Sequence, residues 1–311
     1  MPGVLLLVAM AVALVSTGAC NDRDRPSTPE AMPVVDVQTA ASPKSETSRA
    51  GVFVMPDVDE LVIPTVSESQ LEASGRRSPG PEPSIRVEGS SIIYLGGMSA
   101  MGYDTLMRLA EQGNTSELAI MSPGGSVYWG IKIGEVVYEN GWDVRVLGLC
   151  VSSCANYIFP AGRNKVIEEG GVVGWHGSAR QDYFFAKQKG ISVREEIVDT
   201  ISGALRHDAT HFIDQEGFNR VIARFVAESE TLIEVERAFY ERIGVDGDIS
   251  VYGHFPQRWD VIKGSGGGWT FTLEDMGKFG LGDIVYEGSD AYPSDRAYAL
   301  FSHVVLEVDD R

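Results

Sequence analysis

The sequence is short of basic residues and contains no internal repeat. Lysine and arginine number 26 against 44 aspartates and glutamates, and the formal net charge is −18. No Lys/Arg-rich stripe offsets this charge, so the surface repels phosphate backbones and nucleic acid is not expected as a partner. The 311 residues, 43% of them hydrophobic, suffice for one good-sized core or two small ones.

Cysteine is also scarce, and the first of the three ends an apolar segment. Residues 1–20 form an unbroken apolar and small-residue run that is too short for a comfortable membrane span and is typical of a secretory signal. Its ending, TGAC, resembles a bacterial lipobox. That makes Cys20 the lipidated first residue of the mature protein and predicts a lipid anchor in the periplasm of a bacterial cell envelope. An ordinary cleaved signal is the alternative.

Lipidation of Cys20 leaves one pair of cysteines, Cys150 and Cys154. Disulfides persist in exported proteins, and an even remainder avoids a stray thiol. We therefore expect a disulfide between Cys150 and Cys154, with two small buried thiols as the alternative.

The chain changes character along its length. Residues 21–84 are rich in Pro, Ser, Thr, Glu and Asp, which predicts a disordered tether. From residue 85, strand-like and helix-like patterns alternate and predict an α/β domain with mostly parallel strands over 85–290. Within it, 191–250 has helical periodicity and is predicted to be a helical insertion, and Thr272 is expected to cap a late helix. Residues 291–311 remain as a C-terminal tail.

Three of the predicted strands end in residues that carry chemistry. The first ends in Ser-Pro-Gly-Gly-Ser (122–126), the second in Ser152 and Ser153, and the third in Trp-His-Gly (175–177). Because parallel strands leave their carboxyl ends at one edge of a sheet, we expect these residues to lie together.

Such an edge would hold the parts of an acyl-transfer site. Ser153 would be the nucleophile, His176 the base that takes its proton, and backbone N–H groups of Gly124, Gly125 and Cys154 the oxyanion donors. Each part also has a simpler interpretation: a serine caps a helix, paired glycines form a tight turn, and a histidine after an apolar strand sits in a core. Ser152 is expected to be a cap or a packing residue.

The stretches MSPGGSVYWGIKI, SSCANYIFPAG and VVGWHGS resemble the Clp protease proteolytic subunit and its relatives in the ClpP/crotonase superfamily. The resemblance covers roughly residues 85–288 and implies a spiral of β-β-α units with the helical segment added to it. The family's serine lies nine residues before the glycine of an Ala-Gly pair, which selects Ser153, and His176 follows 23 residues later, within the family's habit.

The resemblance also implies a third, acidic member of the site, for which Asp260 is the candidate. Signal peptide peptidases of this superfamily use a lysine base instead, and Lys165 is the nearby lysine. The family acts on extended polypeptides and assembles as rings or stacks, so a polypeptide substrate and a homo-oligomer are expected. An exported form would act without ATP. No cofactor and no metal are expected, because the His207–His211 pair lacks an adjacent glutamate and a third ligand.

Two other functions use the same fold. A catalytically inactive envelope module could bind peptides in the groove, and the absence of a carboxylate near His176 would favour it. An enzyme acting on acyl esters or thioesters would instead have a closed apolar pocket.

Overall fold

The computed structural model describes residues 58–76, 82–206, 214–262, 268–295 and 304–309. The predicted signal segment with Cys20, the tether up to residue 57 and the His207–His211 pair lie outside the described residues. None of the described helices is both long enough and apolar enough to cross a bilayer.

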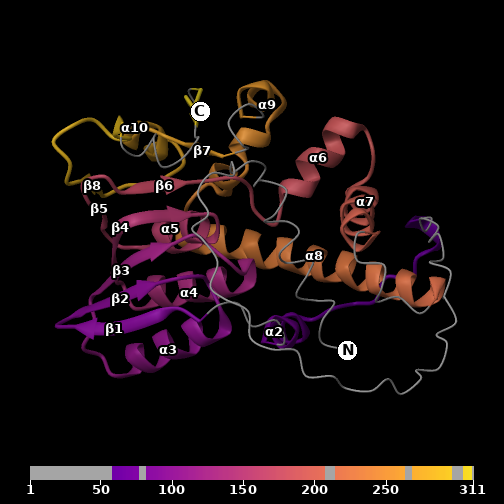
Figure 1. Cartoon of the computed structure of the whole chain (residues 1–311), viewed down its shortest axis with the longest axis horizontal. Helices are drawn as coiled ribbons and strands as arrows, with labels where there is room; N and C mark the ends of the chain where they lie inside the picture. The colour runs from indigo at the N-terminus through magenta and orange to yellow at the C-terminus, as the bar shows by residue number, and fades with distance from the viewer. Residues whose placement is uncertain (1–57, 77–81, 207–213, 263–267, 296–303, 310–311) are drawn as a thin grey trace, which may run out of the picture.

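A mostly parallel sheet forms the core of the fold, as the sequence predicts (Figure 1). Its strands are ordered β1-β2-β3-β4-β5-β8, with β6 beside β4, and only β1 runs antiparallel to its neighbour. The strands are β1 (Ser84–Glu88), β2 (Ser91–Leu95), β3 (Glu117–Ser122), β4 (Asp143–Val151), β5 (Lys165–Ile167), β6 (Val172–Gly174) and β8 (Ile284–Tyr286).

Strand β4 is forked between two neighbours. Its first half, at Val144–Val146, pairs with β5, and its second half, at Leu149–Val151, pairs with β6. Between the halves, the register against β3 jumps from Ile120↔Val146 to Ser122↔Cys150. Because the second half of β4 pairs with β6, the serines after β4 lie beside the residues that follow β6.

The helices start where the sequence supplies capping side chains. Ser99, Ser126, Asp214 and Thr272 each accept a hydrogen bond from a backbone N–H of the first helical turn, as expected of N-caps. The helices are α2 (Glu68–Arg76), α3 (Ala100–Glu111), α4 (Val127–Glu139), α5 (Phe159–Ala161), α6 (Gln181–Lys189), α7 (Val193–Arg206), α8 (Gln215–Ile243), α9 (Pro256–Ile262) and α10 (Leu273–Gly277). Shorter helical turns are η1 (Val58–Glu60), η2 (Cys154–Ile158), η4 (Gly247–Ser250) and η5 (Tyr252–His254).

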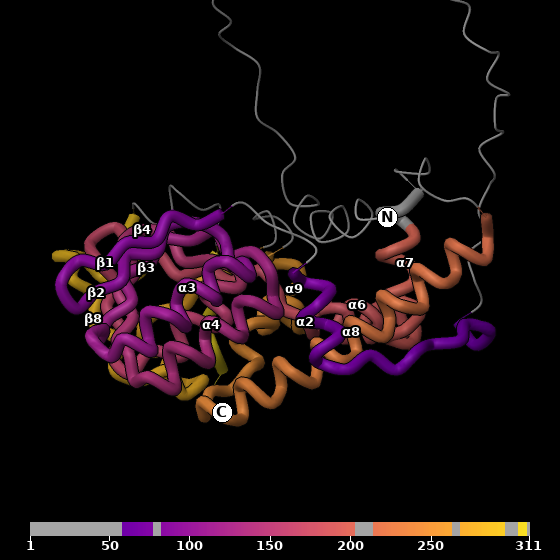
Figure 2. Tube along the Cα trace, turned by 90° about the horizontal axis from the view of Figure 1, so that it is seen from below, coloured from indigo at the N-terminus to yellow at the C-terminus, as the bar shows by residue number. Residues whose placement is uncertain are grey.

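Helix α8 links the sheet to a second group of helices. One end of this 29-residue helix packs beside the sheet, and the other reaches α7 and η1 (Figures 1 and 2). Its carboxyl-terminal part joins the main core through Phe239 and Tyr240, while Phe218, Ile222 and Val226 pack with α7 in a smaller cluster. The helical region therefore forms part of the core as well as an extension from it.

Residues 58–76 are folded, although the sequence predicts a disordered tether there. They form η1 and α2, and Leu71 of α2 is buried against Tyr128 and Trp129 of α4. The Arg76 guanidinium lies 4.8 Å from the Trp129 ring centre and forms an ion pair with Asp104. Val58, Leu61 and Ile63 pack on the smaller cluster of α7 and α8, so apolar contacts at both ends of the segment dock it on the fold.

The predicted C-terminal tail is also partly folded. Strand β9 (Val304–Val305) pairs in parallel with β7 (Trp269–Thr270), and Leu306 and Val308 are buried. The Lys278 ammonium donates to the carbonyl of Val308. Pairing with a strand more than thirty residues away is a non-local contact, which local composition does not reveal.

Candidate functional site

The turn after β3 is built so tightly that only glycine fits. Gly124 has φ +95° and Gly125 φ +138°, both in the region that side chains disfavour. A Cβ on Gly124 would lie 2.5 Å from the Cβ of Ser152, and one on Gly125 would lie 2.6 Å from the nitrogen of Met98. The Gly124 N–H donates to the Ser122 hydroxyl at 3.1 Å. Within the described residues the Gly125 N–H has no such partner, so it is the better oxyanion donor of the two.

The two serines after β4 lie against this turn in different ways. Ser152 is half-buried and has φ +56°, an uncommon value for a residue with a side chain. Ser153 is buried, and its hydroxyl donates to the carbonyl of Gly125 at 2.9 Å. The structure thus brings the predicted nucleophile and the predicted glycine turn into direct contact.

A disulfide and a π-helical turn surround the serines. Cys150, the second-last residue of β4, is bonded to Cys154, the first residue of η2. The bond spans the Ser152–Ser153 turn and restricts its backbone. The turn η2 has π-helical geometry, which occurs often at functional sites because it re-aims side chains relative to a regular helix.

His176 follows β6 at the same edge of the sheet. The N–H and C=O of Trp175 each bond to Trp269 at 2.8 Å, and the Ser152 N–H donates to the Gly174 carbonyl at 3.1 Å. We call residues 175–180 the histidine loop and Ser152–Ser153 the serine turn. These bonds hold the start of the histidine loop beside the serine turn. His176 is exposed to solvent, and desolvation by the surrounding protein lowers the pKa of its imidazole, which favours the neutral form that can accept a proton.

The imidazole does not yet contact a serine. Within the described part of the chain, no hydrogen bond joins His176 to the hydroxyl of Ser152 or Ser153. The Ser153 hydroxyl would have to turn away from Gly125 to meet a base. Catalytic hydrogen bonds are often formed only once substrate is bound, so this geometry is compatible with either a resting enzyme or a binding site.

Three side chains that the sequence did not single out hold the histidine loop. The buried His254 donates from Nε2 to the carbonyl of His176 at 3.1 Å, and burial lowers its pKa to about 4, so it stays neutral. Asn156 of η2 donates to the carbonyl of Gly177 at 2.8 Å. Glu236 of α8 accepts from the hydroxyl of Ser178 at 3.1 Å.

A detectable signal existed for one of these residues. Glu236 interrupts the apolar stripe of its helix, between Leu232 and the Phe239–Tyr240 pair. A charged residue at such a position must be paired, and this marks Glu236 as unusual. His254 and Asn156 have no comparable local mark, because their roles come from contacts between distant segments.

Asp260, predicted to orient the base, lies on an exposed face of α9. Its pairing with His176 stays a prediction. Residues 263–267, which follow α9, lie outside the described residues.

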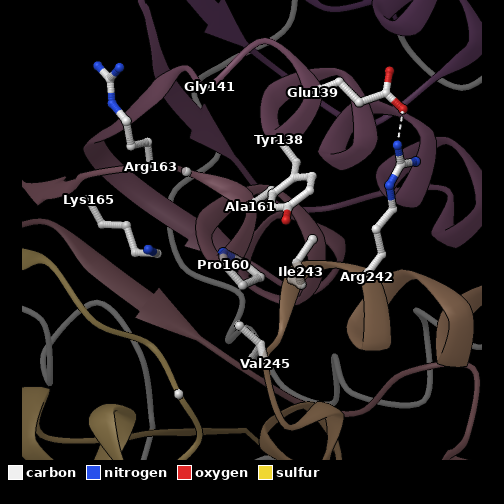
Figure 3. Close-up of a pocket in the computed structure, with 12 residues that line it drawn as sticks. Tyr138, Glu139, Gly141, Pro160, Ala161, Arg163, Lys165, Arg242, Ile243 and Val245 are labelled. Carbon is white, nitrogen blue, oxygen red and sulfur yellow. Dashed lines mark ion pairs between the residues drawn. The ribbon is translucent and has the colours of Figure 1, made fainter.

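Lys165 is at the opposite end of the sheet from the serines. It pairs with Val144 near the start of β4, whereas the serines follow Val151 at its end, roughly 20 Å away at the usual rise of a strand. Lys165 is therefore excluded as their base. It is buried, which lowers its pKa, and it borders a separate pocket of about 660 Å³. That pocket also includes Tyr138, Glu139, Pro160, Arg163, Arg242 and Val245 (Figure 3).

Among known proteins, solved structures resemble this chain with low TM-scores. No family model and no curated protein matches the chain. A ClpP1 mutant from Listeria monocytogenes is 17% identical over 36% of this chain and 78% of its own, with a TM-score of 0.27. A mutant of the 1510-N membrane-bound stomatin-specific protease is 17% identical over 36% of this chain and 68% of its own, with a TM-score of 0.25. Another mutant of that protease, in complex with a substrate peptide, is 12% identical over 64% of this chain and 74% of its own, with a TM-score of 0.34.

Proposed function

We propose that the protein is an exported serine peptidase-like hydrolase that acts on extended polypeptides without ATP. One observation carries the proposal: the glycine turn, the serine pair and the histidine loop, predicted from separate stretches of sequence, meet at one edge of the sheet. The contacts are the Ser153–Gly125 hydrogen bond at 2.9 Å and the Ser152–Gly174 bond at 3.1 Å.

In the proposed reaction, the Ser153 oxygen attacks the carbonyl carbon of the peptide bond while its proton passes to His176. The negative charge that develops on the carbonyl oxygen would be held by the N–H groups of Gly125 and Cys154. His176 then returns the proton to the leaving amine, and water repeats the sequence to release the acid. Asp260 is proposed to orient His176. The lowered pKa of His176 supports its role as base, since a protonated imidazole could not accept the proton.

The setting belongs to the same proposal. The apolar segment 1–20 supports export, and Cys20 is proposed to carry the lipid anchor. The Cys150–Cys154 disulfide beside the serines suits an oxidising compartment. A homo-oligomer is proposed from the sequence resemblance alone.

A peptide-binding module is the second candidate. It is favoured by the buried hydroxyl of Ser153, which is already engaged with Gly125, and by the exposed imidazole of His176. In that function the same strand edge would hold a peptide by main-chain hydrogen bonds, with no covalent step.

Labelling with a fluorophosphonate probe separates the two candidates, because the probe reacts only with an activated serine. The full chain would be expressed in bacterial cells as wild type, Ser153→Ala, Ser152→Ala, His176→Ala and Cys20→Ser. We expect labelling in the membrane fraction, its loss in Ser153→Ala and His176→Ala, and its retention in Ser152→Ala. In Cys20→Ser, the labelled protein should leave the membrane fraction. A folded wild type that takes up no probe would contradict the hydrolase and favour the binding module.

A further inference from the structure

Glu236 is a fully buried carboxylate in the apolar part of α8. Its side chain is 0% exposed, and its neighbours on the helix, Phe239 and Tyr240, belong to the main core. Burying a charge without partners is very costly, so the groups that face this carboxylate explain why it is there.

Those groups come from two segments far apart in sequence. One oxygen, Oε1, accepts from the hydroxyl of Tyr157 in η2 at 2.7 Å. The other, Oε2, accepts from the hydroxyl of Ser178 at 3.1 Å and lies 3.7 Å from the Arg180 Nε. The Ala179 N–H also faces the carboxylate. Burial raises the pKa of Glu236, and all four of these groups oppose that shift by favouring the charged form.

The two segments are the ones that carry the proposed catalytic side chains. Turn η2 begins immediately after Ser153, and the Ser178–Arg180 loop begins two residues after His176. Each carboxylate oxygen therefore holds a different half of the site. Because the carboxylate is rigid, it sets the distance between the halves as well as their orientation.

A second connection runs parallel to the first. Asn156 of η2 donates to the carbonyl of Gly177, and the hydroxyl of Tyr240, one turn after Glu236 on α8, donates to the carbonyl of Asn156 at 2.9 Å. Helix α8 thus contacts η2 at two successive turns and the histidine loop at the first of them.

We propose that Glu236 is a positioning residue, which joins the helix after Ser153 to the loop after His176 and so sets the serine–imidazole geometry for hydrolysis. The inference rests on the proposed function. It also assigns a role to the helical segment 191–250: α8 completes the site by supplying its supporting carboxylate.

A purely structural role would predict a different residue. At this point of the stripe an apolar side chain would pack against Phe239 and Tyr240 without desolvating a charge, and such replacements of buried ion pairs are often neutral or stabilising. The carboxylate is required because the groups that it joins, Tyr157, Ser178 and Arg180, are hydrogen-bond donors.

The test compares Glu236→Gln with Glu228→Gln in the full chain. Glu228 is a matched control, because it is also buried on α8 but pairs with Arg224 of the same helix at 2.8 Å. Three readouts are needed: the rate of fluorophosphonate labelling, amide hydrogen exchange over 154–158 and 176–180, and the NMR signal of the His176 imidazole, assigned with His176→Ala. For Glu236→Gln we expect labelling at least about tenfold slower, exchange at least about tenfold faster in both segments, and a shifted imidazole signal, as the loss of a charged hydrogen bond implies. Glu228→Gln should match wild type in all three.

The outcomes distinguish this inference from the proposed function. If wild type is not labelled, the hydrolase is contradicted, while exchange and the imidazole signal still test the link between the segments. If a folded Glu236→Gln keeps wild-type exchange and imidazole signal, the positioning role is overturned. Should Glu236→Gln fail to fold, Tyr157→Phe and Ser178→Ala each remove one donor and leave the carboxylate. Faster exchange over 154–158 in Tyr157→Phe and over 176–180 in Ser178→Ala supports the link through Glu236. Unchanged exchange in both variants overturns it.

Discussion

At the scale of single residues, the serine turn depends on unusual backbone conformations that lie next to each other. Ser152 is left-handed, and Gly124 packs so closely on it that no other residue fits. A residue held in such a conformation costs of order 1–3 kcal/mol, which the surrounding bonds must offset. Here those bonds are the Ser152–Gly174 hydrogen bond and the Cys150–Cys154 disulfide.

Gly124→Ala should destabilise the protein more than the loss of glycine's backbone freedom alone. Gly113→Ala is the control, because Gly113 also has a positive φ of +70° but a Cβ there meets no atom within 4 Å. We expect about 1–2 kcal/mol for the control and at least about 3 kcal/mol for Gly124→Ala, where the overlap with Ser152 adds to the strain. Urea unfolding measures both. Equal losses would show that the turn relaxes around the new methyl group.

The positions of site residues were predicted best where the local sequence marks the end of a strand. The glycines of the Ser-Pro-Gly-Gly turn, the serine pair and His176 all follow strand patterns, and the structure brings these three stretches to one edge of the sheet. Glu236 was not predicted although it interrupts an apolar stripe, because its partners Tyr157 and Ser178 lie 79 and 58 positions away. His254 could not be found, since its contact with His176 joins residues 78 positions apart.

At the scale of elements, the histidine loop continues directly into helix α6, which packs on α7. The contact contains a buried acidic residue, Glu196, whose carboxylate pairs with Lys189 at 2.6 Å. Asp182, in the first turn of α6, has no such ion pair within the described residues, and burial together with the charge of Glu196 raises its pKa to about 6.

Asp182→Asn should stabilise the protein near neutral pH. The folded state holds this proton more tightly than the unfolded state, so ionised Asp182 costs stability above pH 6, and the cost disappears as the pH falls towards 3.8. A shift of this size corresponds to about 2–3 kcal/mol. We expect that gain at pH 7.5 and little gain at pH 4, measured by urea unfolding.

Asp199→Asn is the control for this prediction, because Asp199 is exposed on α7. Its effect should be within about 0.5 kcal/mol at both pH values. A gain for Asp182→Asn that is the same at pH 4 and 7.5 would contradict the titration argument and would indicate a change in packing.

Element types followed from periodicity, but pairing did not. The apolar pattern of residues 142–149 predicted a strand, and the apolar spacing of 191–250 predicted helices. Neither pattern indicates that β4 is shared by β5 and β6, because that depends on contacts with residues 165–174. For the same reason the pairing of β9 with β7 was not expected.

At the scale of the whole molecule, segments near both ends of the described chain, 58–76 and 304–309, pack against the core. Helix α2 docks on α4 through Leu71, and the residues before α2 dock on α8 through the bond from the Thr231 hydroxyl to the Val66 carbonyl at 2.8 Å. At the other end, the Arg258 guanidinium pairs with Asp309 at 2.8 Å. Residues 58–76 were predicted to belong to the tether and residues 304–309 to the tail, because contacts with distant parts of the chain leave no local pattern.

A chain that begins at residue 77 should be less stable than one that begins at residue 58. Removal of 58–76 exposes the Trp129 surface that Leu71 covers, and the loss of such a buried leucine costs about 2–5 kcal/mol. Thermal unfolding of the two chains, together with Leu71→Ala in the longer one, measures the effect. Equal melting temperatures would mean that α2 contributes nothing to the stability of the core.

The jump in register of β4 has a consequence for insertions and deletions. Between Val146 and Cys150 the strand advances four residues while β3 advances two, so the surplus is an even number. Side chains alternate between the two faces of a strand, and an even surplus preserves parity: Cys150 keeps the buried orientation of Val146. Deleting one residue from 147–149 would invert that parity and turn the disulfide and the serines to the other face, whereas deleting two would preserve it. The lengths that this strand can adopt without losing its site are therefore spaced two residues apart.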